Sequence, residues 1–156
     1  MAIHGRLEDF LKEHNVHYRT ITHPEAYTAQ EVAASMHVPG KDLAKAVIVK
    51  ASDRFVMAVL PASGQVDFER LRKILGEDDV RLANEDEFRS LFPDCEPGGE
   101  PPFGNLYDVT TLVDRSLAED EHIFFNAGNH HDAVELDYRD YEKLVHPRVE
   151  EFAVHK

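Results

Sequence analysis

The sequence predicts an α/β fold of the α+β type: a single compact domain with a central mixed or antiparallel sheet and flanking helices over residues 1–156. Two apolar, β-rich runs, 44–51 and 54–60, flank the short turn Ser52-Asp53, which is typical of a hairpin. Helical patterns are interleaved with further short strands. The parallel dinucleotide-binding fold is disfavoured, because strands and helices do not strictly alternate and the first turn is not glycine-rich.

The first elements follow from spacing and capping residues. Apolar residues at helical intervals predict an amphipathic helix over 5–14. Residues 17–22 have the composition of a short strand. Thr28, with Glu31 three positions later, forms a capping box, so a helix begins there and ends before Pro39.

Capping residues also delimit the helices after the hairpin. Asp67 is placed to cap a helix that ends at Gly76, and a short strand is expected near 80–83. Asn84, followed three residues later by a glutamate, predicts another capped helix that extends to Phe92.

Strands dominate the last third of the chain. We expect them at 111–114, 122–127 and 133–137, followed by a helix over 138–145. The partly apolar tail, 149–154, suits either an added edge strand or a dimer contact.

Composition excludes several functional classes. The net charge of −13 argues against broad nucleic-acid binding, including DNA. No apolar run approaches the ~20 residues of a membrane span, and the N-terminus lacks a signal-peptide core. With its single cysteine, Cys95, the chain is expected to be cytoplasmic, and that thiol is either a nucleophile or incidental. The histidines match no zinc motif, so no metal is expected.

The segment 93–104 is the most suggestive for function. It contains four prolines and three glycines, which cannot continue a helix or a central strand. Such a stiff loop can hold backbone N–H groups toward an oxyanion, a carbonyl or a phosphate. The alternative is an ordinary surface connection between two elements.

Two further places could carry chemistry. Lys45 opens an apolar strand and can project its ammonium group into a cleft, or extend into solvent as strand-end lysines do. Residues 126–132 follow another strand and contain amides, a glycine and the pair His130-His131, either of which could be a general base. The alternative for this second segment is a polar hairpin turn.

Taken together, these residues resemble the YbaK/prolyl-tRNA-synthetase-associated editing-domain family over nearly the whole chain. The resemblance rests on the order and spacing of its pieces. These are the N-terminal helix, Thr28-Ala-Gln-Glu-Val-Ala, Ala44-Lys45-Ala-Val-Ile-Val, the helix that begins at Asp67, Gly98-Gly99-Glu-Pro-Pro-Phe-Gly104 and Asn126-Ala-Gly128.

The resemblance implies a trans-acting aminoacyl-tRNA deacylase that hydrolyses the ester of a mischarged tRNA without a metal or cofactor. Its partner would be the acceptor end of an aminoacyl-tRNA, with or without a synthetase. Lys45 would contact the terminal nucleotide and the carbonyl region, and Gly98 and Gly99 would act in catalysis. The implied substrate-binding residues are Glu100, Pro101, Pro102, Phe103, Gly104, Asn126, Gly128 and His130.

Two departures from the family pattern keep other functions open. Ala46 stands where relatives often have a polar residue, and Glu100 replaces a small or neutral one. The alternatives are a noncatalytic module that binds tRNA or a synthetase, and a hydrolase of small esters or nucleotides.

Overall fold

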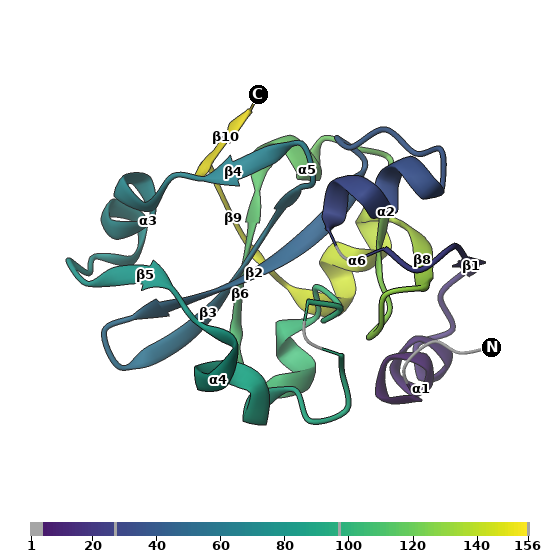
Figure 1. Cartoon of the computed structure of the whole chain (residues 1–156), viewed down its shortest axis with the longest axis horizontal. Helices are drawn as coiled ribbons and strands as arrows, with labels where there is room; N and C mark the ends of the chain where they lie inside the picture. Colours follow the sequence, from purple (N-terminus) through teal and green to yellow (C-terminus); the bar gives the residue numbers. More distant parts are fainter. Residues whose placement is uncertain (1–4, 27, 97, 156) are drawn as a thin grey trace.

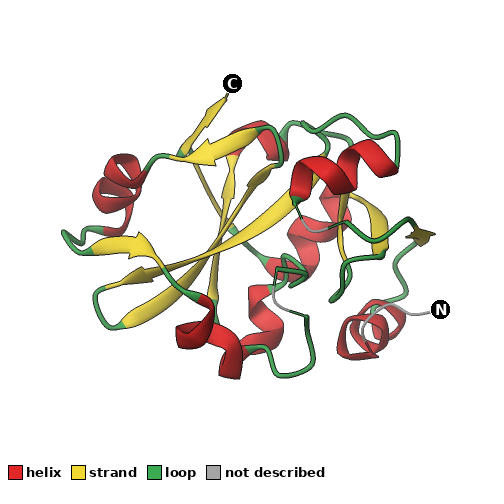
Figure 2. Cartoon of the chain, viewed as in Figure 1, coloured by secondary structure: helices red, strands yellow, loops and turns green. Residues whose placement is uncertain are grey.

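The computed structural model describes residues 5–26, 28–96 and 98–155. Strands and helices are mixed along the chain, with the two longest strands crossing the middle of the molecule (Figures 1 and 2). The strands are β1 (Tyr18–Thr22), β2 (Leu43–Ala51), β3 (Arg54–Pro61), β4 (Gly64–Val66), β5 (Val80–Leu82), β6 (Thr110–Asp114), β7 (His122–Asn126), β8 (Asp132–Asp137), β9 (Arg148–Glu150) and β10 (Ala153–His155). The helices are α1 (Gly5–Glu13), α2 (Ala29–Ser35), α3 (Phe68–Leu75), α4 (Glu85–Phe88), α5 (Arg115–Ala118) and α6 (Tyr138–Val145), with the 3-10 turns η1 (Arg89–Leu91) and η2 (Gly104–Tyr107).

The main sheet is mixed, which confirms the predicted fold class. Its strand order is β1-β8-β7-β2-β3-β6-β9, with β5 also paired to β2, and β10 pairs with β4 in a small second sheet. The β2–β3 hairpin is antiparallel, whereas β2–β7, β3–β6 and β6–β9 are parallel.

The predicted helix caps are present. The Thr28 hydroxyl accepts the Glu31 N–H, and the Glu31 carboxylate accepts the Thr28 N–H, both at 3.1 Å. Asp67 accepts two N–H groups at the start of α3, and Gly76 ends that helix with a φ of 68°. These side chains satisfy donors that a helix start would otherwise leave without partners.

Successive residues of β2 serve opposite faces of the sheet, as a strand requires. Ala44 and Ile48 belong to the larger core cluster, which contains α6, whereas Val49 and Ala51 pack in a second cluster with Leu71 of α3. The sheet therefore separates two apolar layers.

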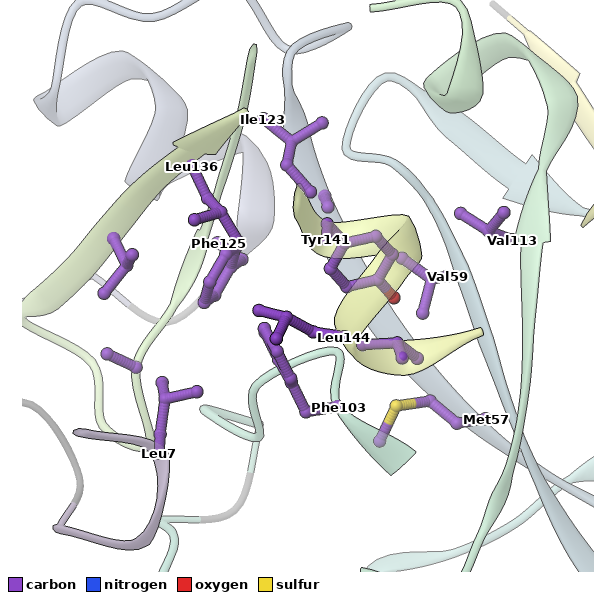
Figure 3. Close-up of a cluster of buried hydrophobic side chains, with 14 of the residues drawn as sticks. Leu7, Met57, Val59, Phe103, Val113, Ile123, Phe125, Leu136, Tyr141 and Leu144 are labelled. Atoms are coloured by element: carbon purple, nitrogen blue, oxygen red, sulfur yellow. The ribbon is translucent and has the colours of Figure 1, made fainter. Parts of the chain in front are cut away.

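The loop 93–104 contributes to the larger core. Figure 3 shows Phe103 beside Phe125 and Tyr141, and their ring centroids lie 5.3 Å and 5.4 Å from that of Phe103. The Tyr141 hydroxyl donates a hydrogen bond of 2.6 Å to the carbonyl oxygen of Pro102. One half of this loop is thus fixed by packing as well as by its prolines.

The structure also corrects the expected elements. The helix after Asn84 ends at Phe88 and tightens into η1 before Phe92. The tail forms edge strands, because β9 pairs with β6 and β10 pairs with β4. The short elements β4, α5 and η2 were not expected. None of the described helices is long and apolar enough to cross a membrane.

Candidate active site

Strand β2 changes partners along the edge opposite β3. At its start, Leu43 and Ala44 pair with β7, and from Val49 onward it pairs with β5. Within the described chain, positions 45–47 have no strand partner on this edge. Lys45 is the first residue of this unpaired stretch.

Lys45 is half-buried and available to bind a ligand. Burial lowers the pKa of its ammonium group. It borders a pocket of about 230 Å³ together with Thr28, Gln30, Ser63 and other residues at the start of α2 and the β3–β4 turn. Within the described part of the chain, its ammonium group has no hydrogen-bond or ion-pair partner.

Asn126 occupies the position on β7 that corresponds to Lys45 on β2. Ala44 pairs with Phe125, so the next residue along each of these parallel strands is Lys45 on β2 and Asn126 on β7. The Oδ1 atom of Asn126 is buried and has no hydrogen-bond partner among the residues that the structure describes. A cation and a polar acceptor thus each follow directly on the last paired residues of these two strands.

The first half of the loop is fastened to the turn between β7 and β8. The Gly128 N–H donates to the Gly99 carbonyl oxygen, and the Glu96 N–H donates to the Gly128 carbonyl oxygen, both at 2.8 Å. The Glu96 carboxylate also accepts the His130 N–H at 3.2 Å. Backbone and side-chain bonds therefore join two segments that lie about thirty residues apart in the sequence.

Glycine is required where these two segments meet. Gly98 and Gly128 have φ values of 87° and 100°, which side chains rarely adopt. A Cβ on Gly99 would lie 2.8–2.9 Å from three backbone atoms of Asn129. The predicted glycines thus permit the close approach between loop and turn.

The β7–β8 turn also holds the segment that leads into α2. The Ala26 N–H donates to the carbonyl oxygen of His130, and the His23 N–H donates to that of His131. The segment before α2 and the glycine loop are therefore both attached to the same turn.

His130 and Glu100 are both buried, and both lie close to Gly98. A Cβ on Gly98 would lie 3.2 Å from Cε1 of His130, and the Gly98 N–H donates to Oε2 of Glu100 at 3.1 Å. The Gly99 N–H donates to the Glu96 carbonyl oxygen. In this structure, therefore, neither the Gly98 N–H nor the Gly99 N–H is bare, and the part of both glycines in catalysis stays a prediction.

The second half of the loop is packed against the core. Pro101, Pro102, Phe103 and Gly104 are all buried. A Cβ on Gly104 would overlap the carbonyl oxygen of Val109. These residues hold the loop against the core, and their direct contact with substrate stays a prediction.

Sequence reasoning missed two residues that shape the turn. Asn129 Oδ1 accepts the N–H groups of His131 and Asp132, at 2.9 Å and 2.7 Å. This is an Asx-type turn, and the asparagine before His130-His131-Asp132 could have indicated it. Glu96 was missed because nothing in its spacing marks it.

Cys95 is poorly suited to act as a nucleophile. Burial, the largest influence, raises the pKa of its thiol to about 11, and its sulfur lies 3.3 Å from the Tyr107 hydroxyl. A thiol with this pKa is almost entirely protonated at neutral pH. Across the described ranges, no three His, Cys, Asp or Glu side chains form a group that could hold a metal ion.

Comparisons with known proteins agree with this architecture. The multifunctional Ser/Thr-tRNA deacylase ProXp-y of Escherichia coli K12 is 28% identical over 154 residues, covering 96% of this chain and 92% of that protein. The proline–tRNA ligase of Thiobacillus denitrificans is 35% identical over 101 residues, which are 64% of this chain. The chain spans only 17% of that ligase's length.

Solved structures show the same fold. A proposed trans-editing enzyme for prolyl tRNA synthetase superposes with a TM-score of 0.84 at 17% identity, covering 96% of this chain and 95% of that one. The hypothetical protein APE2540 superposes with a TM-score of 0.85 at 21% identity, covering 96% and 99% of the two chains. The model of the aminoacyl-tRNA editing domain matches residues 23–144, and the chain therefore belongs to the aminoacyl-tRNA editing domain family.

Proposed function

We propose that this protein is a trans-acting aminoacyl-tRNA deacylase, which hydrolyses the ester between a mischarged amino acid and the terminal ribose of its tRNA. The observation that carries the proposal is that Lys45 and Asn126 each follow the last paired residues of β2 and β7, and that the turn after Asn126 is fastened to the glycine loop. Family membership and the near-complete overlap with the E. coli deacylase support it.

In this proposal, Lys45 positions the substrate. Its half-buried ammonium group contacts the terminal nucleotide near the ester carbonyl, where a partly desolvated charge interacts more strongly than in water. The pocket beside it, formed by the start of α2 and the β3–β4 turn, receives part of that nucleotide.

The glycine loop would stabilise the developing oxyanion. The Gly99 N–H is held by a backbone carbonyl, but the acceptor of the Gly98 N–H is the Glu100 side chain, which can move aside. The Gly98 N–H is then the donor that the oxyanion can take over.

The reaction needs no covalent intermediate. Water adds to the ester carbonyl, the bond between the acyl carbon and the ribose oxygen breaks, and a proton from the water passes to that oxygen. The products are a free amino acid and uncharged tRNA. An ester is already activated, and the neighbouring ribose hydroxyl can help to position the water, so a protonated Cys95 is no obstacle.

The test is a deacylation screen with several mischarged tRNAs, comparing the native protein with Lys45→Ala. We expect hydrolysis of at least one substrate and a decrease of about tenfold or more in the variant, the loss expected for a misplaced substrate. Lys50→Ala is a matched control, since Lys50 lies on the same strand but pairs with Glu87 at 3.6 Å.

Two results would contradict the proposal. Tight tRNA binding without any turnover would identify a noncatalytic binding module. Faster hydrolysis of free aminoacyl esters than of charged tRNA would identify a hydrolase of small esters. A synthetase partner stays a proposal, which adding prolyl-tRNA synthetase to the same assay would test.

A further inference from the structure

Glu100 is a buried acid with no lysine or arginine partner among the residues that the structure describes. Its side chain is 6% exposed, although glutamate is rarely buried unless it is paired. Its carboxylate accepts the N–H of Gly98 at 3.1 Å and also its own N–H. In the chain as described, no lysine or arginine forms an ion pair with it.

The surroundings of Glu100 carry little compensating charge. Burial is the main influence on its carboxyl group and raises its pKa, and the charge of Glu85 acts in the same direction. His130, on the other side of Gly98, favours the ionised form. A buried carboxylate in this position is costly unless another positive group completes the site.

The substrate of the proposed reaction supplies such a group. Every free aminoacyl ester carries an ammonium group on the carbon next to the scissile carbonyl. If the carbonyl oxygen approaches the Gly98 N–H, that ammonium group comes close to the carboxylate that this N–H now binds. No other cation of the aminoacyl end is common to all amino acids.

We propose that Glu100 recognises the α-ammonium group of the aminoacyl ester and thereby selects aminoacyl-tRNA over N-acylated tRNA, including peptidyl-tRNA. This inference rests on the proposed function. Binding exchanges one set of contacts for another: the carboxylate moves from the Gly98 N–H to the ammonium group, and the N–H is released to the carbonyl oxygen. An N-acylated substrate has no charge to attract the carboxylate, so the exchange fails.

Binding tests this recognition independently of hydrolysis. The probes are 3′-alanylamino-3′-deoxyadenosine, whose amide resists hydrolysis, and its N-acetyl derivative, titrated against the protein by calorimetry. We expect the free amine to bind about tenfold or more tightly than the acetylated form, a ratio typical of a charged contact. Glu100→Gln should reduce this ratio to near one, because glutamine keeps the shape and the acceptor for Gly98 but lacks the charge.

Glu85→Gln is the matched control, because it removes an equal charge from an exposed residue of α4 near Glu100. It should preserve the ratio, and melting curves should show that both variants are folded. An unchanged ratio in Glu100→Gln would overturn the inference. The inference would also be overturned if Glu100→Gln reduced the binding ratio only for analogues with a hydroxyl side chain, such as seryl. Glu100 would then recognise the amino-acid side chain and not the α-ammonium group.

The two proposals fail in different ways. If the free amine binds preferentially through Glu100 but no charged tRNA is hydrolysed, the recognition stands and the deacylase function fails. If charged tRNAs are hydrolysed but N-acetylated ones are hydrolysed equally fast, the function stands and the recognition fails.

Discussion

Replacing Gly99 with alanine should damage both stability and activity. The new Cβ would lie 2.8–2.9 Å from the O, C and Cα atoms of Asn129, and backbone atoms cannot move aside as a flexible side chain can. If the contact is kept, overpacking costs about 1–3 kcal/mol. If the loop withdraws, the two backbone bonds to Gly128 are lost, at about 1 kcal/mol each. Both routes predict a loss of about 2 kcal/mol.

Urea unfolding gives the change in stability, and the deacylation assay gives the change in rate under conditions where the variant is folded. We expect a rate decrease of about tenfold or more, because a loop displaced by about an ångström misplaces the reacting groups. Gly5→Ala is the control, since a Cβ there meets nothing within 4 Å. If Gly99→Ala unfolds within about 0.5 kcal/mol of the native protein and retains its rate, the close approach of loop and turn is unimportant.

Three other residues give independent tests. Burial and then the charge of Asp42 raise the pKa of Asp120 to about 6, so ionisation of this carboxyl group destabilises the folded state above that pH. Urea unfolding of Asp120→Asn should therefore give a free energy of unfolding about 1 kcal/mol higher than that of the native protein at pH 7.5, allowing for solvent screening. At pH 3 the two proteins should be equally stable. Cys95 should react with iodoacetamide at pH 8 about tenfold or more slowly in the native than in the unfolded protein. Asp114→Ala should cost about 2–4 kcal/mol by thermal unfolding, because its buried carboxylate accepts the N–H groups of Phe152 and Ala153.

Local rules predicted most of the fold. Thr28 and Asp67 start helices because their side chains accept N–H groups near in sequence, and Gly76 ends one because it can adopt a positive φ. The family was also predicted from motif order, and the family model confirms it. Strand β9 was harder to predict, because a three-residue edge strand has little local signal and forms through its pairing with the distant strand β6.

The site was harder to predict because its contacts join distant segments. The sequence indicates that Gly98 and Gly99 are conformationally special, but not that Gly99 faces Asn129 or that Glu96 binds His130. The occupied amide of Gly98 could not be foreseen either, since it depends on the rotamer and burial of Glu100.

The two halves of the loop differ in how they are held, and this difference is compatible with the proposed exchange of Glu100 contacts. Phe103 and the Pro102 carbonyl are fixed in the core by Tyr141, so the second half cannot shift without disturbing packing. The first half is held by backbone bonds to Gly128, so in the proposed exchange it is the Glu100 side chain that moves. A ligand that displaces this carboxylate therefore replaces its bonds to the Gly98 N–H and to its own N–H, and the backbone bonds to Gly128 are kept. In the proposed mechanism, preorganisation of this kind lowers the cost of binding, because the amide that would receive the oxyanion is already in place.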